Sequence, residues 1–458
     1  MPVSPDQIHH ITVLADSDTR WKWGALAARR IAPEARLDGR LLRGRATPTA
    51  RQLSELGIAA DSLREMTMRQ FLAEAEAEAE AGARGGHHDA ASDPDSGGPG
   101  VVLLACVGGT VQAALHGLAR VWGQAPRPRP VTVTGYVGVV YEKLADGLLL
   151  RHGADVVIAN SPQDARRFRD VYEGVGADAS CVTEAALPFL DGAPYRGPDA
   201  ARRFTAVFAA QPSVPASREE RTYLLRRAAR HAERHPDRDV LVKLRSKPGE
   251  HTTHVEEFPL QRLAARLDPP LPPGVRLVYG RMGEVLDRAD LLVTVSSTAA
   301  LEAMHRGMPT AVLTDFGVRE ALGNHHFTGS GCLASWDELD DGLLPRADAD
   351  WLRANGVGAD DPFRLVRERV EGLAARAAAG QLPLPRPYYT PRAAPAYLPG
   401  VLARHGLDPQ GRPVGTAPPA EDGQVRRFTR EFTRNAARAA YRHGVQRVAP
   451  VIRRLGEL

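Results

Sequence analysis

Residues 286–315 read LDRADLLVTVSSTAALEAMHRGMPTAVLTD, and this stretch decides the fold prediction. The apolar, partly β-branched run at 291–295 predicts a buried strand. Hydroxyl residues at 296–298 supply helix N-cap chemistry, and 299–305 holds strong helix formers that a Gly and a Pro bring to an end. A second apolar run begins at 310–314. The stretch therefore predicts a strand, a polar turn, a helix and a second buried strand.

The turn between the strand and the helix is a candidate anion site. Where a strand runs directly into a helix, free backbone N–H groups, hydroxyls and the positive end of the helix dipole point at one place. Ser296, Ser297 and Thr298 provide the hydroxyls. The alternative is an ordinary strand–helix–strand unit, because many α/β proteins begin a helix with Ser or Thr.

The segment SSTAALEAMHRGMPTAV resembles the nucleotide-binding segment of GT-B glycosyltransferases, in which a hydroxyl-rich turn leads into LEAM..G.P. This resemblance implies that the three hydroxyl residues contact the phosphate of a nucleotide-sugar donor and that Glu302 hydrogen-bonds its ribose. It also implies two Rossmann-like domains that face a cleft. Neither a metal nor any cofactor beyond the nucleotide-sugar co-substrate is expected, since hydroxyls, cations and the helix dipole can stabilise the leaving phosphate.

Strand and helix patterns alternate in two blocks along the chain, which predicts two doubly wound α/β domains. We expect an N-terminal acceptor domain at 1–190, a linker at 191–203 and a C-terminal donor-nucleotide domain at 204–378. A Pro-rich strap at 379–423 and a basic amphipathic helix at 424–458 follow in the sequence.

Composition is that of a globular protein, with 43% hydrophobic and 25% charged residues. No apolar run approaches the ~20 residues of a membrane-spanning helix, and the first residues lack the features of a signal peptide. Three widely spaced cysteines suit neither a disulfide framework nor a zinc site, which favours the cytoplasm. A helix is predicted at 64–80, and the low-complexity stretch 82–100 predicts a disordered insertion.

The net charge of +4 is too small to indicate a nucleic-acid-binding protein. Its distribution is uneven, because residues 424–458 carry nine Arg and two Glu, or +7, and leave −3 for the rest of the chain. Such a basic amphipathic helix either docks on the N-terminal domain or lies at the inner face of an anionic membrane. The sequence leaves both possibilities open.

A cluster of cations follows a predicted strand in the second block. Lys243, Arg245 and Lys247 alternate where the strand end opens into the ligand cleft of this fold. They are either solvated edge charges or a clamp for the donor phosphates. The segment resembles the K.HP element of sialyl-, polysialyl- and CDP-glycerol-type transferases, although Lys247 replaces its His, so the donor base stays open. Gln211, after the first strand of this block, contacts the donor or belongs to a plain loop.

The loop after the first predicted strand is the candidate location of a catalytic base. A transferase needs a base that deprotonates the acceptor hydroxyl. Asp18 is the first candidate and Asp16 the second, with a helix N-cap as the alternative role for either carboxylate. Glu142, which follows a Gly-rich turn, is a further candidate base.

Other residues are expected to line the cleft and to contact the acceptor. Arg20 and Lys22 suit an anionic acceptor, and Trp21 suits either stacking on a sugar or packing in the core. Asn324 and His325 follow a strand on the cleft side and suit donor or acceptor contact, the alternative being a Gly-rich surface loop.

We therefore expect a metal-independent glycosyltransferase that moves a sugar from a nucleotide-activated donor to a bacterial cell-surface glycan or lipid-linked acceptor. One alternative on the same fold is a sugar-nucleotide epimerase or a CDP-glycerol-type phosphotransferase. Another is a catalytically inactive nucleotide- or glycan-binding protein, which the missing His-Pro and the lack of a secure base keep open.

Overall fold

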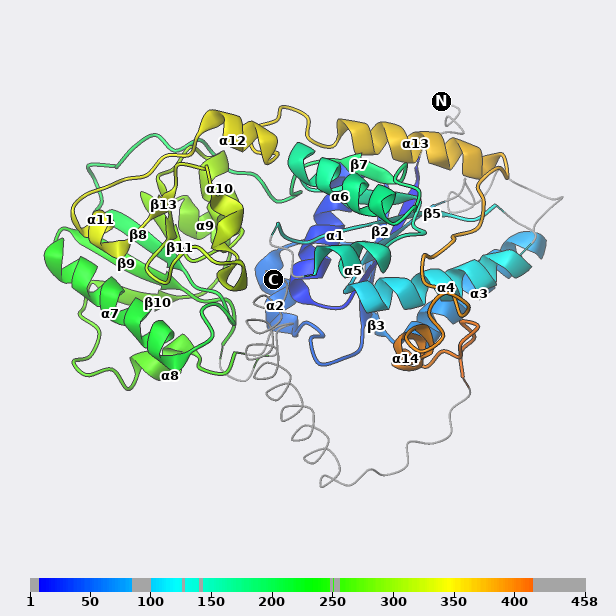
Figure 1. Ribbon diagram of the computed structural model, residues 1–458, viewed down its shortest axis with the longest axis horizontal. Coiled ribbons are helices and arrows are strands. Elements are labelled where there is room, and N and C mark those ends of the chain that lie inside the picture. Colours follow the sequence, from blue (N-terminus) through cyan, green and yellow to red (C-terminus); the bar gives the residue numbers. More distant parts are fainter. Residues whose placement is uncertain are drawn as a thin grey trace, which may run out of the picture. The chain divides into compact units, whose positions relative to one another are not determined.

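The computed structural model describes residues 8–84, 100–125, 128–139, 143–247, 250 and 256–414. Within them the chain forms two parallel β-sheets of seven and six strands, each flanked by helices (Figure 1). The predicted two-block α/β architecture is confirmed. The predicted base Glu142, the predicted basic helix at 424–458 and most of the predicted insertion lie outside the described residues.

The first sheet has the strand order β3-β2-β1-β4-β5-β6-β7. Its strands are β1 (His10–Ala15), β2 (Arg36–Leu42), β3 (Ser62–Met66), β4 (Val101–Ala105), β5 (Val131–Gly135), β6 (Val156–Ala159) and β7 (Val182–Glu184). The helices between them are α1 (Asp18–Ile31), α2 (Ala50–Leu56), α3 (Met68–Arg84), α4 (Gly108–Gln124), α5 (Leu144–Leu149) and α6 (Pro162–Gly174).

The second sheet has the order β10-β9-β8-β11-β12-β13. Its strands are β8 (Phe204–Ala209), β9 (Arg238–Lys243), β10 (Val275–Val278), β11 (Leu291–Thr294), β12 (Thr310–Leu313) and β13 (Leu333–Ala334). Its helices are α7 (Arg218–Arg234), α8 (Leu260–Ala264), α9 (Met282–Leu286), α10 (Ala299–His305), α11 (Trp336–Asp340) and α12 (Ala349–Ala354), followed along the chain by α13 (Arg364–Ala378) and α14 (Leu398–Ala403).

Both sheets reverse their strand order at one place, between β1 and β4 in the first and between β8 and β11 in the second. In doubly wound sheets, ligands bind outside the carboxyl ends of the strands at such a switch point. The turn after β11 was the deciding stretch of the sequence, and its helix α10 spans the predicted Ala299–His305. The fold therefore places this turn where a ligand site is expected.

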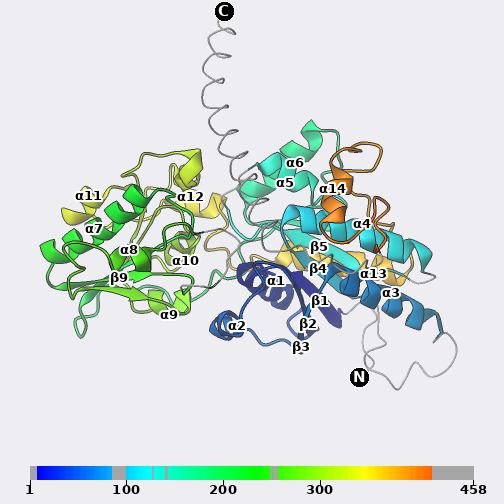
Figure 2. The same ribbon diagram turned by 90° about the horizontal axis from the view of Figure 1, so that it is seen from below.

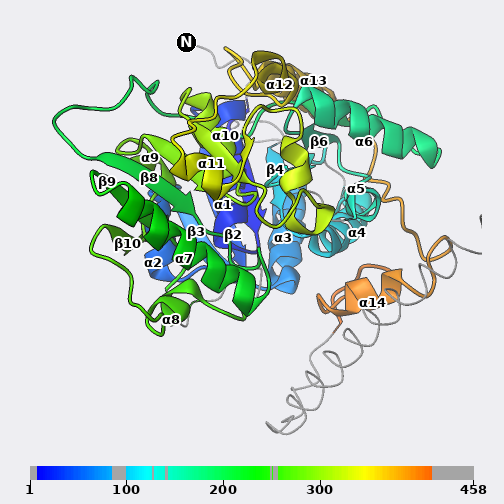
Figure 3. The same ribbon diagram turned by 60° about the vertical axis from the view of Figure 1, so that its left-hand side comes forward.

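Buried apolar side chains fill both faces of each sheet, as parallel strands require. One cluster continues from the α1 side of the first sheet to the α10 side of the second. A second cluster lies between the first sheet and α3, α4 and α6, and a third lies under α7 and α11. Figure 3 shows these helices beside their sheets. The two domains thus share one continuous core, while each keeps its own core on the other face.

The described helices that come last in the chain return to the first domain. Helix α13 packs on β5, β6, β7 and α1, although its residues fall in the stretch assigned to the second domain (Figure 1). Helix α14 packs on α4 (Figure 2), and there His116 Nε2 donates to the Tyr389 carbonyl oxygen at 2.9 Å. The described part of the predicted strap is thus fixed to the first domain.

The structure corrects the helix predicted at 64–80. Residues Ser62–Met66 form the edge strand β3, and α3 begins only at Met68. The middle three side chains of β3 are exposed, and two of them are charged, so its apolar alternation is too weak to read from the sequence. Among the described residues, no helix is long and apolar enough to span a membrane.

Candidate functional site

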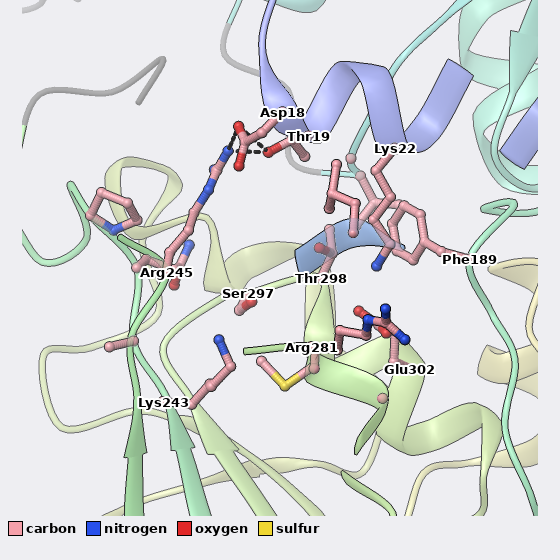
Figure 4. Close-up of a pocket in the computed structure, with 18 of the residues that line it drawn as sticks. Asp18, Thr19, Lys22, Phe189, Lys243, Arg245, Arg281, Ser297, Thr298 and Glu302 are labelled. Carbon is pink, nitrogen blue, oxygen red and sulfur yellow. Dashed lines mark hydrogen bonds and ion pairs between the residues drawn. The ribbon is translucent and has the colours of Figure 1, made fainter. Parts of the chain in front are cut away.

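A cavity of about 1130 Å³ lies where the strand ends of the second sheet meet helices of the first domain. The second domain lines it with the loops that follow β8, β9, β10, β11 and β12. The first domain lines it with one face of α1, the end of α2, the turn after β5 and the segment that holds Pro188, Phe189, Asp191 and Gly192. Figure 4 shows side chains from both walls pointing into this space.

The β11–α10 turn divides its three hydroxyl residues between two roles. Ser296 is buried, and its hydroxyl donates to the Leu322 carbonyl oxygen. Gln211 Oε1 accepts from the Ser296 backbone N–H at 2.9 Å, so Gln211 and Ser296 hold each other. Ser297 and Thr298 are half-buried and line the cavity, with Ser297 Oγ accepting from the Ala299 N–H at 3.2 Å. Ser297 and Thr298 are thus the hydroxyls that a ligand can reach.

Lys243 ends β9 and reaches the same space as Ser297 (Figure 4). Its side chain is buried, and Nζ donates to the Leu244 carbonyl oxygen at 2.7 Å. Burial lowers the pKa of Lys243 to about 8, against the opposing effect of Glu55 and Glu302. A buried ammonium is costly without a counter-charge, so this position suits an anionic ligand.

Glu302 of α10 is the buried carboxylate of the cavity. Burial raises the pKa of Glu302, and the positive charges of Lys22, Arg306 and Lys243 act in the opposite direction. Lys22 comes from α1 of the first domain, whereas Arg306 and Lys243 belong to the second. Cations from both domains therefore act on one buried carboxylate.

Arg245 does not point at the space that Lys243 and Ser297 share. Its Nη2 lies 2.6 Å from Asp18 Oδ1 and contacts Thr19 Oγ1, as the dashed lines of Figure 4 show. Thr19 Oγ1 also donates to Asp18 Oδ1, at 3.3 Å. The predicted phosphate clamp and the predicted base are thus paired with each other across the two domains.

Lys247 and Asp16, both predicted site residues, do not line the cavity. The Lys247 backbone N–H donates to Glu250 Oε2 at 2.8 Å. Asp16 accepts from Arg20 Nη1 at 3.1 Å and from the Val107 N–H at 2.9 Å, which ties the β1–α1 turn to the start of α4. The helix N-cap is Ser17, whose Oγ accepts from the Arg20 N–H.

Three predicted contact residues have other surroundings. Trp21 is buried, and a Cβ added to Gly39 would lie 2.7 Å from its ring, so Trp21 packs in the core. Asn324 is buried, with Nδ2 donating to the Leu313 and Gly317 carbonyl oxygens at 3.0 and 2.9 Å. His325 is exposed and does not line the cavity. The loop that contains Asn324 and His325 does reach the cavity, through residues 320–323.

The first-domain wall contains residues that were not predicted from the sequence. Leu26, Arg29 and Arg30 continue the α1 face that begins with Asp18 and Lys22. The helical spacing of these positions would have identified the face, but not what it faces. Phe189 lies outside any helix or strand, and Lys22 Nζ is 4.8 Å from its ring centroid. No sequence pattern marks Phe189, because only folding brings it to α1.

Among the described residues, His231, His235 and Asp340 lie close enough together to hold a metal ion. They come from α7 and α11 and do not line the cavity. His231 Nδ1 bonds Asp340 Oδ1 at 2.8 Å, and the other oxygen accepts from Arg227 at 2.9 Å. Hydrogen bonds within the protein therefore already use the atoms that a metal would need.

Over residues 11–373 the chain matches the family model described as "Putative glycosyltransferase (DUF6716)". The chain belongs to this family. The match spans both sheets, and with the two doubly wound domains it confirms the resemblance to GT-B glycosyltransferases. No curated protein matches the chain.

Solved structures that resemble this member of the family do so at low identity. MnaA from S. aureus, solved with UDP, has a TM-score of 0.47 and 12% identity, covering 82% of this chain and 98% of MnaA. A UDP-N-acetylglucosamine 2-epimerase has a TM-score of 0.47 and 13% identity, with coverage of 81% and 97%. The spinosyn rhamnosyltransferase SpnG has a TM-score of 0.38 and 12% identity, with coverage of 83% and 98%.

Proposed function

We propose that this protein transfers a sugar from a nucleotide-activated donor to a glycan or lipid-linked acceptor of the cell surface. The observation that carries the proposal is the convergence of Lys22 and Lys243, from different domains, on Glu302 beside Ser297 and Thr298. Membership of a family described as glycosyltransferases supports the same reaction class.

The donor diphosphate would bind to the two ammonium groups and the two reachable hydroxyls. Lys243 is buried, so its ammonium group has lost much of its hydration, and a bound diphosphate would supply the missing hydrogen-bond acceptors. Hydrogen bonds between an ammonium and a phosphate are charge-assisted and therefore strong. Glu302 would accept from the ribose hydroxyls, as the resemblance to GT-B enzymes implies. Ser296 and Gln211 would act indirectly, because their hydrogen bonds fix the turn that presents Ser297.

Transfer would require an acceptor hydroxyl near Asp18, on the first-domain wall. The acceptor oxygen would form a bond to the anomeric carbon, whose bond to the diphosphate oxygen would break, with the electron pair leaving on the diphosphate. Asp18 would take the hydroxyl proton. Lys22 and Lys243 would stabilise the negative charge that develops on the leaving group, which is the reason to propose metal-independent transfer.

The test is a thermal-unfolding screen of the full-length protein with UDP, GDP, CMP, CDP and dTDP. A ligand at a hundredfold excess over Kd stabilises the folded state by about 2.7 kcal/mol, so a selective nucleotide should raise the unfolding temperature clearly. Lys243→Ala should abolish most of this shift, and the matched variant Lys247→Ala, outside the cavity, should keep it. A well-folded protein that responds to no nucleotide would contradict the proposal.

The selected nucleotide then identifies the donor sugars to test for transfer in chelator-treated buffer. Sugar transfer that persists without metal supports the proposal. Epimerisation in the absence of any acceptor would instead show the alternative enzyme on this fold. Nucleotide binding with neither transfer, donor hydrolysis nor epimerisation would identify a binding protein.

A further inference from the structure

We propose that Arg245 is a positioning residue that exchanges partners: it holds Asp18 while the site is empty and moves to the donor diphosphate when the donor binds. This inference rests on the proposed function and adds an order of events to it. Asp18 would become free to accept a proton only after the donor has bound. The donor would therefore bind before the acceptor reacts.

The pair between Arg245 and Asp18 has the features of a specific contact. Its 2.6 Å separation is that of a charge-assisted hydrogen bond, and only 28% and 14% of the two side chains are exposed. Arg245 and the Thr19 hydroxyl both meet the same oxygen, Asp18 Oδ1. One oxygen of the carboxylate thus accepts from a donor of each domain.

Arg245 can also reach the place proposed for the donor diphosphate. It follows Lys243 by two residues in the loop after β9, so the two Cα atoms are at most about 7 Å apart. Both side chains line the same cavity, but Figure 4 shows Arg245 extended toward Asp18 while Lys243 points at Ser297. Rotation of the long, unbranched Arg245 side chain would turn it toward the diphosphate without any change in the sheet.

Charge decides the direction of the exchange. Asp18 offers the guanidinium a single negative charge, whereas a diphosphate brings two or more and accepts the planar fork of an arginine in a bidentate geometry. A bound diphosphate and the Asp18 carboxylate are both negative and repel each other. A guanidinium located between them lowers this repulsion, which also favours movement of Arg245 toward the diphosphate. A second ion pair across the domains, Arg51 with Glu250, does not depend on the exchange and would keep the walls together.

If Arg245 exchanges partners, removal of the Asp18 charge should release Arg245 and so strengthen diphosphate binding, but only when Arg245 is present. Inorganic pyrophosphate is the probe, and calorimetry on the full chain gives its Kd for wild type, Asp18→Asn, Arg245→Gln and the double variant. Asp18→Asn should tighten binding about fivefold in the wild-type background and less than about twofold in the Arg245→Gln background. Arg245→Lys, which keeps the charge, should restore most of the coupling.

Glu320→Gln is the matched control, because Glu320 also brings a carboxylate to the cavity wall but is not the partner of Arg245. Its effect on the Kd should be the same with and without Arg245. An equal gain from Asp18→Asn in both backgrounds would overturn the exchange and leave the proposed function standing. Absence of binding by pyrophosphate and by every nucleotide would overturn both. Thermal unfolding of each variant shows that it is folded.

Discussion

The two domains contain the same local unit at their switch points, a strand that runs through a hydroxyl residue into a helix, yet they use it differently. After β1, Ser17 caps α1, Asp16 is bound to Arg20 and Val107, and Asp18 is bound to Arg245. After β11, Ser296 is buried and donates to the Leu322 carbonyl oxygen, whereas Ser297 and Thr298 line the cavity, where the Ser297 hydroxyl accepts from the Ala299 N–H and keeps its own proton for a ligand. The first turn is largely satisfied by the chain itself, whereas the second leaves polar groups for a ligand.

This contrast teaches that residue type does not separate scaffold from binding site, but hydrogen-bond satisfaction does. Buried polar groups need partners, so a side chain such as Asn324, which is buried and hydrogen-bonded within its own domain and does not line the cavity, has a structural role. A group that lines the cavity and keeps unused hydrogen-bond donors, such as the Lys243 ammonium or the Ser297 hydroxyl, is available for a ligand. Substitutions at residues that look alike in the sequence should therefore have different effects on stability and on binding.

The largest effect is expected at Trp21, which the sequence suggested could stack on a sugar but which packs in the core. Trp21→Ala should lower the free energy of unfolding by about 3–5 kcal/mol, because it removes a fully buried ring that packs on Gly39. Chemical denaturation with Trp21→Phe as the milder comparison measures this loss. A variant that keeps its stability but binds sugar ligands more weakly would show that Trp21 belongs to the site.

The neighbours Asn324 and His325 should differ in the same way. Asn324→Ala should cost about 1–3 kcal/mol of stability, because the buried Leu313 carbonyl oxygen loses its donor. His325→Ala should change stability by less than about 0.5 kcal/mol, since its side chain is exposed. Equal unfolding midpoints for the two variants would contradict the division between them.

Nucleotide affinity should depend on pH through Lys243, which lines the cavity. Burial lowers the pKa of Lys243 to about 8, so below that pH the free protein already carries the ammonium that a phosphate needs. Above pH 8 the amine must take up a proton on binding, and nucleotide affinity should fall about tenfold per pH unit. Lys243→Arg keeps its charge, and calorimetry between pH 7 and 9.5 should find its affinity constant. A wild-type affinity that stays flat would remove Lys243 from the phosphate site.

The smallest effect is expected within the β11–α10 turn. Ser297→Ala should weaken nucleotide binding a few-fold, as expected for one hydrogen bond of about 0.5–1.5 kcal/mol, with little change in stability. Ser296→Ala should lower stability instead, because the buried Leu322 carbonyl oxygen loses its donor. Paired binding and unfolding measurements decide between the two roles. The reverse assignment of effects would show that Ser296 is the phosphate ligand.

The sequence located the β11–α10 unit well because the information is local. Apolar runs, cap residues and helix formers each act over a few residues, and α10 has its predicted bounds. It failed at β3, where an exposed edge strand has little apolar alternation. It failed again between Lys243 and Arg245, since two cations in one loop carry no mark of which one will meet Asp18 across the domains.

The sequence by itself determined the two α/β blocks, the family resemblance and the strand–turn–helix unit at β11 and α10, because strand and helix periodicity and cap chemistry are local properties of the chain. The tertiary structure alone decided which polar groups remain available. It buried Trp21 and Asn324, bound Asp16 within the first domain, paired Asp18 with Arg245 and brought Lys22 to Glu302. These outcomes depend on contacts between residues far apart in the sequence, and only the packed fold specifies such contacts.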